Sequence, residues 1–169
     1  MKKLCELNDK DVGLKLNLDV RFAPRTAARA ILMKKNFIAL LNVGKNGYYK
    51  LPGGGVYSNE KIEECLKREV LEETGCTISL VKDVGEIIEH RSLGKMVQTS
   101  YCFIAEVAKE GKPRFTNFEI KYGFKLVWVT INRAINLLKN SKPADYNGKF
   151  IVKRDTLFLQ EAKRIMLKN

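Results

Sequence analysis

The sequence predicts a mixed α/β protein, an α/β/α sandwich built around a central mixed β-sheet. Apolar or alternating segments of strand length are interspersed with segments of helical periodicity. A glycine-rich loop stands directly before one of the helical segments, as in many strand-to-helix connections. Hydrophobic residues make up 45% and charged residues 30% of the 169 residues, which is typical of a globular protein. We therefore expect one domain over residues 1–169.

The first strands are expected in the amino-terminal part of the chain. Leucine alternates with polar residues over residues 14–20, as in a strand with one buried face. Two apolar segments, residues 27–33 and 37–43, flank the short polar sequence Lys34-Lys35-Asn36. This arrangement predicts a β-hairpin.

The second half of the sequence continues the alternation of strands and helices. Strand patterns are found at residues 78–81, 85–90, 97–107 and 125–129. Helical patterns cover residues 132–138 and about 149–167. Strands bracketed by helices in this way indicate helices on both faces of the sheet.

The most informative helix, over about residues 60–74, follows Pro52 and three consecutive glycines. Glycines allow backbone conformations and close approaches that a Cβ atom would prevent. Ser58 or Asn59 is the expected N-cap, because either side-chain oxygen can accept a hydrogen bond from the first free amides. Gly75 supplies the left-handed residue that ends the helix.

Three glutamates of this helix form an arrangement that helix electrostatics do not favour. At about 100° per residue, Glu69, Glu72 and Glu73 lie within about a third of the helix circumference. Glu69 and Glu73 are like charges at positions i and i+4, which destabilises a helix by about 0.2–0.5 kcal/mol. Glu72 and Glu73 also lie in the last turn, where the helix dipole favours cations. A divalent cation would relieve both conflicts, so we interpret the cluster as a functional site.

The stretch from Gly54 to Cys76, GGVYSNEKIEECLKREVLEETGC, resembles the box of the Nudix hydrolase family (MutT-like). The fixed positions of the box are filled by Gly54, Glu60, Arg68-Glu69, Glu72-Glu73, Gly75 and an apolar Cys76. Agreement at so many positions is far more specific than a lone glycine motif. The chain departs from the usual pattern at Tyr57 and Asn59, where family members often carry Glu and Gly. Neither departure removes a carboxylate.

The resemblance implies a Nudix fold and a hydrolase that cleaves a diphosphate linked to another group. The cofactor would be Mg²⁺, with Mn²⁺ as an alternative. The implied metal ligands are the carboxylates of Glu69, Glu72 and Glu73 and the carbonyl of Gly53, an all-oxygen set that suits Mg²⁺. Glu69 and Glu73 would then be catalytic, and the choice of general base stays open.

The resemblance also assigns supporting roles around these carboxylates. Arg68 would orient Glu69 by hydrogen bonding, and Glu60 would give outer support. The residues expected to border the substrate are Gly53, Gly54 and Gly55. Glu119, within the loop expected at residues 117–121, is a candidate for a late auxiliary acid, although a surface role for this acid fits the sequence equally well.

The substrate is less well specified than the reaction. We favour a nucleoside triphosphate or a modified nucleotide, followed by an ADP-ribose-like substrate. Alternatives are a hydrolase that acts on the 5′-triphosphate end of RNA and a non-catalytic nucleotide-binding module, against which the intact carboxylates argue. Tyr48, Tyr49, Tyr57 and Phe118 are candidates to stack a base, with packing in the core as the alternative role for each.

The net charge of +12 does not by itself indicate a nucleic-acid-binding protein. Its lysines and arginines are scattered, with only short clusters, so an RNA end is a partner that we do not favour. Cysteines 5, 65, 76 and 102 show no metal-binding spacing and are expected to be free thiols. We expect a cytoplasmic protein with no membrane partner, and a homodimer as one candidate assembly.

Overall fold

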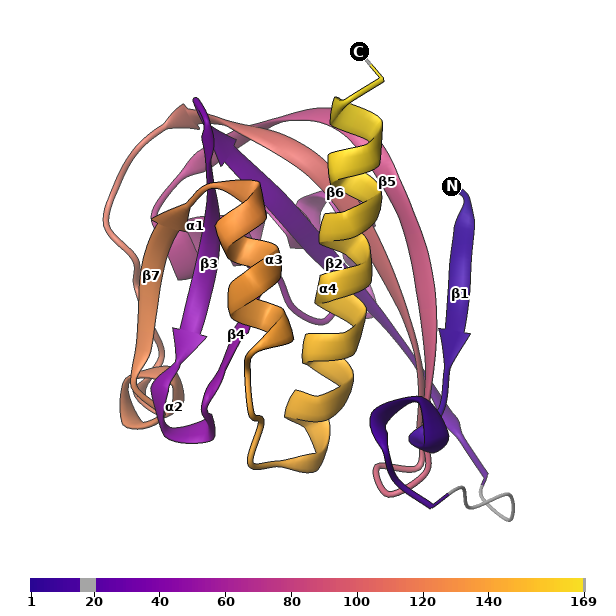
Figure 1. Ribbon diagram of the computed structural model, residues 1–169. Helices are drawn as coiled ribbons and strands as arrows, with labels where there is room; N and C mark the ends of the chain where they lie inside the picture. Colours follow the sequence, from indigo (N-terminus) through magenta and orange to yellow (C-terminus); the bar gives the residue numbers. More distant parts are fainter. Residues whose placement is uncertain (16–20, 169) are drawn as a thin grey trace.

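A seven-stranded mixed sheet forms the centre of the computed structural model, which describes residues 1–15 and 21–168 (Figure 1). The strands are β1 (Lys3–Leu7), β2 (Ala23–Lys34), β3 (Phe37–Val43), β4 (Tyr48–Lys50), β5 (Thr77–Arg91), β6 (Met96–Lys109) and β7 (Phe124–Val129). The α-helices are α1 (Ile62–Thr74), α2 (Asn117–Lys121), α3 (Ile131–Lys139) and α4 (Tyr146–Met166). Two short 3₁₀ turns are η1 (Asp9–Val12) and η2 (Gly44–Asn46).

The order of the strands makes the sheet mixed, as predicted. It runs β1-β5-β6-β2-β3-β4, and β7 pairs with β3. The pairs β1–β5 and β2–β6 are parallel, whereas β5–β6, β2–β3, β3–β4 and β3–β7 are antiparallel. The long central strands β5, β6 and β2 support the helices on both faces of the sheet and the glycine loop.

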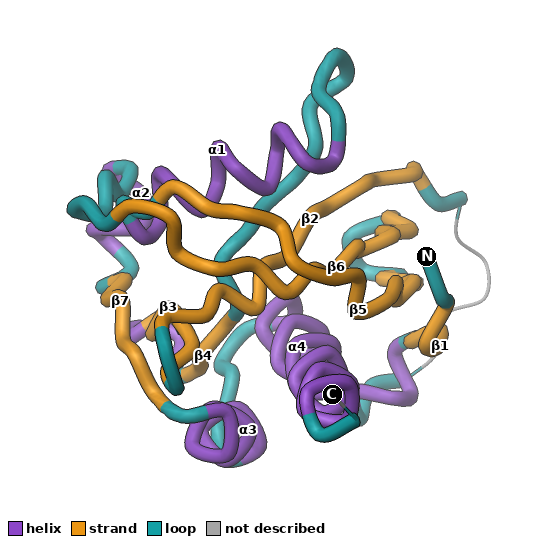
Figure 2. Tube along the Cα trace, turned by 90° about the horizontal axis from the view of Figure 1, so that it is seen from above, coloured by secondary structure: helices purple, strands orange, loops and turns teal. Residues whose placement is uncertain are grey.

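Helices cover both faces of this sheet. Figure 2 shows α1 on one side and α3 and α4 on the other. Neighbouring residues of a strand face opposite sides, so Ile31 and Leu32 of β2 belong to different cores. The core beneath α1 includes Ala28, Leu32, Cys65, Leu66 and Val70, and the core beneath α3 and α4 includes Ile31, Leu40, Leu138, Phe150 and Phe158. The predicted α/β/α sandwich is confirmed.

Several expected elements are found close to their predicted bounds. The hairpin joins β2 and β3, with Met33 opposite Ile38 and Lys34 opposite Phe37. Lys35 in its turn has a φ of 54°. The helices expected over residues 132–138 and 149–167 correspond to α3 and α4, and α1 ends at Gly75, whose φ of 75° is left-handed.

Other elements differ from the prediction. The two strands expected at residues 78–81 and 85–90 form one strand, β5, because irregularities in its pairing with β6 carry the strand past residues 80–85. The short edge strand β1 was not predicted; it pairs parallel to β5. Of the strand expected over residues 14–20, residues 16–20 lie outside the described residues, and residues 14 and 15 do not form a strand.

The glycine loop is held along the edge of β2 that β3 leaves open. Ala30 N donates to Pro52 O at 2.9 Å, and Ala28 N donates to Gly54 O at 3.0 Å. Between these bonds Gly53 has a φ of 131°, and a Cβ there would overlap the Ala28 carbonyl. Glycine is therefore required at position 53 by both its backbone conformation and its surroundings. The loop thus runs beneath α1.

Candidate active site

The residues singled out in the sequence surround one cleft of about 460 Å³ between the glycine loop, α1 and α2. The lining includes the three predicted glycines, two carboxylates of the box, the candidate auxiliary acid and two cations; these are Gly53, Gly54, Gly55, Glu69, Glu73, Glu119, Arg25 and Lys50. Glu72 is not part of this lining. The fold therefore brings together most of the predicted site and adds two cations that the sequence interpretation did not include.

Glu73 is the buried carboxylate of the site, with a residue exposure of 2%. Its Oε2 accepts a hydrogen bond from Gly53 N at 2.7 Å, and its Oε1 lies 2.6 Å from Lys50 Nζ. Burial raises the pKa of Glu73, while Lys50 and the Gly53 N–H oppose that rise. The last turn of α1 is thus tied directly to the glycine loop.

Arg68 forms hydrogen bonds to two further carboxylates, those of Glu60 and Glu69. Its Nη1 donates to Glu69 Oε1 at 2.7 Å, while Nε and Nη2 donate to the two oxygens of Glu60 at 2.7 and 2.9 Å. This two-point bond to Arg68 is the main reason why the pKa of Glu60 falls to about 2. Arg68 Nη2 also donates to the Gly55 carbonyl at 3.2 Å. Arg68 therefore connects α1 to Glu60, which precedes the helix, and to the glycine loop.

The start of α1 lies later than predicted. The helix begins at Ile62 with Lys61 as its N-cap, not with Ser58 or Asn59. Glu60 remains outside the helix because its side chain is held by Arg68 and by the Tyr57 backbone N–H, which donates to Glu60 at 3.1 Å.

The unusual Tyr57 has a definite place in this arrangement. Its ring centroid lies 4.2 Å from the Arg68 guanidinium carbon, a cation–π geometry. Tyr57 is otherwise 66% exposed and lines the cleft. The departure from the usual box pattern at position 57 thus covers the organising arginine on its solvent side.

Glu72 occupies a different environment from its two neighbours. Its side chain is 50% exposed, and its Oε2 lies 3.7 Å from Arg68 Nη1. Across residues 1–15 and 21–168, no three histidine, cysteine, aspartate or glutamate side chains are gathered as the ligands of a metal ion would be. The predicted set of three carboxylates is therefore distributed over the end of α1 and is not assembled around one point.

The oxygens near the glycine loop nevertheless fit a divalent cation. The Lys50 ammonium lies 2.6 Å from Glu73 Oε1 and 3.5 Å from the Gly53 carbonyl, so two predicted ligands already share one positive charge. A Cβ at Gly54 would overlap the Glu69 carboxylate, which shows how closely this third ligand approaches the loop. Carboxylate and carbonyl oxygens are the ligands that Mg²⁺ prefers.

Glu119 also lines the cleft, and it lies in the short helix α2 and not in the predicted loop. Its carboxylate accepts hydrogen bonds from the backbone N and the hydroxyl of Thr116 at 2.7 and 3.0 Å. The sequence Thr-x-x-Glu is a capping box and could have indicated this helix start. The structure therefore gives Glu119 a capping role and places it beside the cleft.

The two cations that the sequence interpretation missed come from strands. Lys50 ends β4 directly before the glycine loop, and Arg25 lies near the start of β2. Neither residue belongs to the box, and only the pairing of the loop with β2 places both beside it. No local pattern in the sequence indicates these positions.

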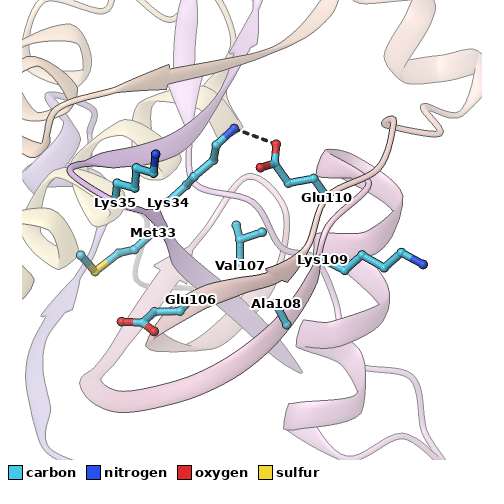
Figure 3. Close-up of a pocket in the computed structure, with 8 residues that line it drawn as sticks. All are labelled: Met33, Lys34, Lys35, Glu106, Val107, Ala108, Lys109 and Glu110. Atoms are coloured by element: carbon cyan, nitrogen blue, oxygen red, sulfur yellow. Dashed lines mark hydrogen bonds and ion pairs between the residues drawn. The ribbon is translucent and has the colours of Figure 1, made fainter.

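A separate hollow of about 520 Å³ lies at the ends of β2 and β6 (Figure 3). Lys34 reaches across it to Glu110 at 2.7 Å, and the other lining side chains include Lys35, Glu106 and Lys109. It contains no residue of the box, so we do not assign chemistry to it.

Comparison with known proteins agrees with this description. The family model described as the NUDIX domain matches residues 20–149. The chain is similar to a NUDIX hydrolase from Nitrosomonas europaea, with a TM-score of 0.65 and 16% identity over 84% of this chain and 90% of that chain.

Two further solved structures are similar. A MutT protein from Methanosarcina mazei Go1 matches with a TM-score of 0.57 and 21% identity over 86% of this chain and 99% of that chain. An ADP-ribose pyrophosphatase from Streptococcus suis 89-1591 matches with a TM-score of 0.52 and 17% identity over 83% of this chain and 93% of that chain. At these identities the structural matches show the fold.

Proposed function

Since the chain belongs to the NUDIX family of pyrophosphohydrolases, we propose that it is a Mg²⁺-dependent hydrolase acting on a nucleoside diphosphate linked to another group. The bond cleaved would be a diphosphate anhydride. The substrate would be a nucleoside triphosphate, a modified nucleotide or an ADP-ribose-like molecule.

One observation carries this proposal: the glycine loop and two carboxylates of α1, Glu69 and Glu73, line a single cleft. Gly53 and Glu73 are 20 positions apart in the sequence, yet the Gly53 N–H donates to Glu73 at 2.7 Å. Glu69 faces the same cleft and is held by Arg68. Such an arrangement supports binding of phosphate groups next to oxygen ligands for a cation.

In this proposal Glu69, Glu73 and the Gly53 carbonyl would hold Mg²⁺, with Mn²⁺ as an alternative ion. Glu72 would join them by rotation of its half-exposed side chain. When bound, the ion supplies charge neutralisation for the phosphates and a polarised water. Arg68 keeps the Glu69 carboxylate turned toward the cleft, and Glu60 keeps Arg68 in place.

Exposure of the aromatic residues supports a nucleotide as the substrate. Tyr57 and Phe118 both line the cleft and are 66% and 61% exposed. Tyr48, in contrast, is buried, and Tyr49 packs against the core. Flat exposed rings that line the cleft are suited to stack on a base.

We also propose a cytoplasmic location. The four cysteines are free, and three of them are buried, which suits a reducing compartment. In the described part of the chain, no helix combines the length and apolar character needed to cross a membrane. A homodimer remains a further proposal that gel filtration would test.

The test is a substrate panel with Mg²⁺ or Mn²⁺ that includes nucleoside triphosphates, an oxidised nucleotide, ADP-ribose, a UDP-sugar and 5′-triphosphorylated RNA. We expect release of a nucleoside monophosphate, or of the corresponding phosphate product, from at least one nucleotide. Glu69→Gln should abolish most of this turnover. Glu119→Gln should reduce it less than tenfold if Glu119 only caps α2, and much more if it accepts the proton in catalysis.

Two results would overturn the proposal. One is tight nucleotide binding without turnover of any member of the panel, which would indicate a binding module. The other is unchanged turnover in Glu69→Gln, which would remove the assigned carboxylate from the chemistry. Turnover of RNA alone, with a steep dependence on salt, would move the substrate from free nucleotides to RNA ends.

A further inference from the structure

A row of three polar side chains crosses the sheet and ends at the cleft. Arg25 of β2 lies opposite Gln98 of β6, and Gln98 lies opposite Glu89 of β5. Glu89 and Gln98 have no exposed surface, whereas Arg25 lines the cleft. The row therefore links the interior beneath α4 to the surface next to the glycine loop.

The buried end of the row determines how the Gln98 amide is turned. Glu89 Oε2 accepts hydrogen bonds from Gln98 Nε2 at 2.8 Å and from Ser100 Oγ at 3.1 Å, and Glu89 Oε1 accepts one from Arg91 at 2.6 Å. An ionised carboxylate can only accept, so Gln98 must direct its NH₂ group toward Glu89 and its carbonyl away from it. That carbonyl accepts from Arg25 Nη1 at 2.5 Å.

The glycine loop leaves the space in which the Arg25 guanidinium lies. A Cβ on Gly55 would come within 2.7 Å of Arg25 Nη2 and 3.3 Å of its Cζ. Any larger residue at position 55 would push the guanidinium away from the loop. Gln98 thus holds the guanidinium by a hydrogen bond, and Gly55 leaves the space that the guanidinium occupies.

The charge of Arg25 is not neutralised by a carboxylate. None of the ion pairs between described residues includes Arg25, whereas the other cation of the cleft, Lys50, is bound to Glu73 at 2.6 Å. Arg25 is thus the cation beside the loop that is available to an anion.

Three buried arginines lie in the interior behind Arg25. Arg29, Arg91 and Arg154 share this interior with the carboxylates of Glu89 and Asp155, and the Glu73 carboxylate also acts on Arg29. One side-chain nitrogen of each of these three arginines is buried without a hydrogen-bond partner. Partial burial of the guanidinium lowers the pKa of Arg25, and Arg91 and Arg154 act in the same direction, while Glu89 and Glu69 oppose them.

We propose that Arg25 is a substrate-binding residue that holds the diphosphate, and that Gln98 is the positioning residue that directs its guanidinium into the cleft. The identity of the ligand rests on the proposed function. A guanidinium is planar and offers several N–H donors, so the donors that Gln98 does not use suit two phosphate oxygens. Arg25 also borders a second hollow of about 490 Å³, which it shares with the cleft together with Val56 and Tyr57. A diphosphate at Arg25 would have room for a substituent on each side.

The first test compares Arg25→Gln with Arg133→Gln, which removes the same charge from an exposed position on α3. Binding of α,β-methylene-ADP is measured by calorimetry, and circular dichroism checks the fold of each variant. We expect Arg25→Gln to weaken binding by about tenfold to a hundredfold, the usual effect of losing a charged hydrogen-bond donor. Arg133→Gln should bind like the original protein. For a hydrolysed substrate, KM should rise by a similar factor while kcat changes less than about threefold.

The role of Gln98 is tested by Gln98→Met alone and combined with Arg25→Gln. A positioning role predicts that Gln98→Met weakens binding about fivefold to tenfold when Arg25 is present and has no further effect when Arg25 is absent. An equal loss in both backgrounds would show that Gln98 supports the fold only, which overturns its positioning role. Because Arg25→Gln changes an exposed side chain, the first test stands even where Gln98→Met fails to fold.

The outcomes separate this inference from the proposed hydrolysis. Equal affinities of Arg25→Gln and Arg133→Gln, or no binding of α,β-methylene-ADP by the original protein, would overturn the role of Arg25. Arg25-dependent binding without turnover of any panel substrate would support the inference and contradict the hydrolase function. Turnover with an unchanged KM in Arg25→Gln would support the hydrolase function and contradict the role of Arg25.

Discussion

Two buried glutamates on opposite faces of the sheet have pKa values shifted in opposite directions. Glu73 of α1 is 2% exposed, and burial raises its pKa, opposed mainly by the single cation Lys50. Glu89 of β5 has no exposed surface, and burial acts on it in the same direction. There, however, Arg154 and Arg91 outweigh burial and lower the pKa to about 2.

The difference lies in the number and kind of partners. Glu89 accepts hydrogen bonds from two arginines, a glutamine amide and a serine hydroxyl, so its charge is fully compensated inside the protein. Glu73 has one lysine and one backbone N–H. A carboxylate with spare affinity for positive charge is suited to bind a cation, whereas one surrounded by guanidinium groups is suited to hold strands and a helix together.

The two regions are also connected. Arg154 binds both Glu89 at 3.2 Å and Asp155 at 2.7 Å, and Asp155 accepts a hydrogen bond from Leu51 N at 2.8 Å. Leu51 directly precedes Pro52 and the glycine loop. The Glu89 region thus anchors the backbone on which the Glu73 region depends.

The largest effect should follow from Glu73→Gln. We expect kcat to fall by about 10²–10⁴-fold, because the change removes the buried charge that the proposed cation needs. The fold should remain intact, although glutamine offers one acceptor oxygen where Glu73 uses two, so the variant keeps only one of the hydrogen bonds from Gly53 N and Lys50 Nζ. Steady-state kinetics with Mg²⁺ measures kcat, and thermal melting in EDTA measures the stability of the fold. A Glu73→Gln variant with undiminished turnover would contradict the contrast between the two glutamates.

The converse change is Glu89→Gln. It leaves Arg91 and Arg154 buried without their shared counter-charge, and breaking a buried ion pair in this way costs about 3–5 kcal/mol. We therefore expect a large loss of unfolding free energy, measured in urea. At temperatures where the variant is folded, its kcat should fall less than that of Glu73→Gln. The matched control is Glu86→Gln, on the same strand and outside the network. Equal stability of the two variants would show that Glu89 is not the centre of the network.

The sequence predicts the Glu73 region much better than the Glu89 region, and the reason is physical. The box residues are close in the chain and lie on one helix, so helical periodicity is enough to bring Glu69 and Glu73 together. The row Arg25, Gln98 and Glu89 depends on the register of three strands, which no local pattern reveals.

The distinction between local and tertiary interactions also explains where the sequence prediction missed Lys50 and began α1 too early. Lys50 reaches Glu73 only because the loop folds along β2, a tertiary effect. Glu60 stays outside α1 because Arg68, a full two turns later in the chain, holds it. Strand β3, whose apolar pattern is local, has the bounds that were predicted, Phe37–Val43.

A third prediction concerns the pH dependence of stability. Glu89 has a folded pKa of about 2 against an ordinary value of 4.5, so it stabilises the protein above pH 4.5 and loses this contribution as the pH falls toward 2. This loss amounts to about 3 kcal/mol. Glu73 has the opposite sign: its raised pKa means that its contribution falls as the pH rises above 4.5. Urea unfolding from pH 2 to 7 in EDTA should therefore show, relative to the original protein, a weaker rise of stability between pH 2 and 4.5 for Glu89→Gln and a more positive slope above pH 4.5 for Glu73→Gln. Parallel curves for all three proteins would contradict the assigned shifts.

The smallest effect is expected where an aromatic ring covers an arginine in each region. Tyr57 lies over Arg68 at 4.2 Å and is exposed, whereas Phe150 lies over Arg91 at 5.3 Å within the core. An exposed cation–π contact is worth about 0.5–1 kcal/mol, so Tyr57→Leu should lower the melting temperature by about 1–4 °C. It should reduce kcat only about twofold to fivefold, since Arg68 keeps its bonds to Glu60 and Glu69. Tyr57→Phe retains the ring and should leave both quantities unchanged.

Phe150→Leu also removes core volume and should cost about 1 kcal/mol more than Tyr57→Leu. If Tyr57→Leu proved the more destabilising of the two, Tyr57 would be holding the loop and α1 together, and the site would depend on its aromatic cover as strongly as the interior depends on its ion pairs.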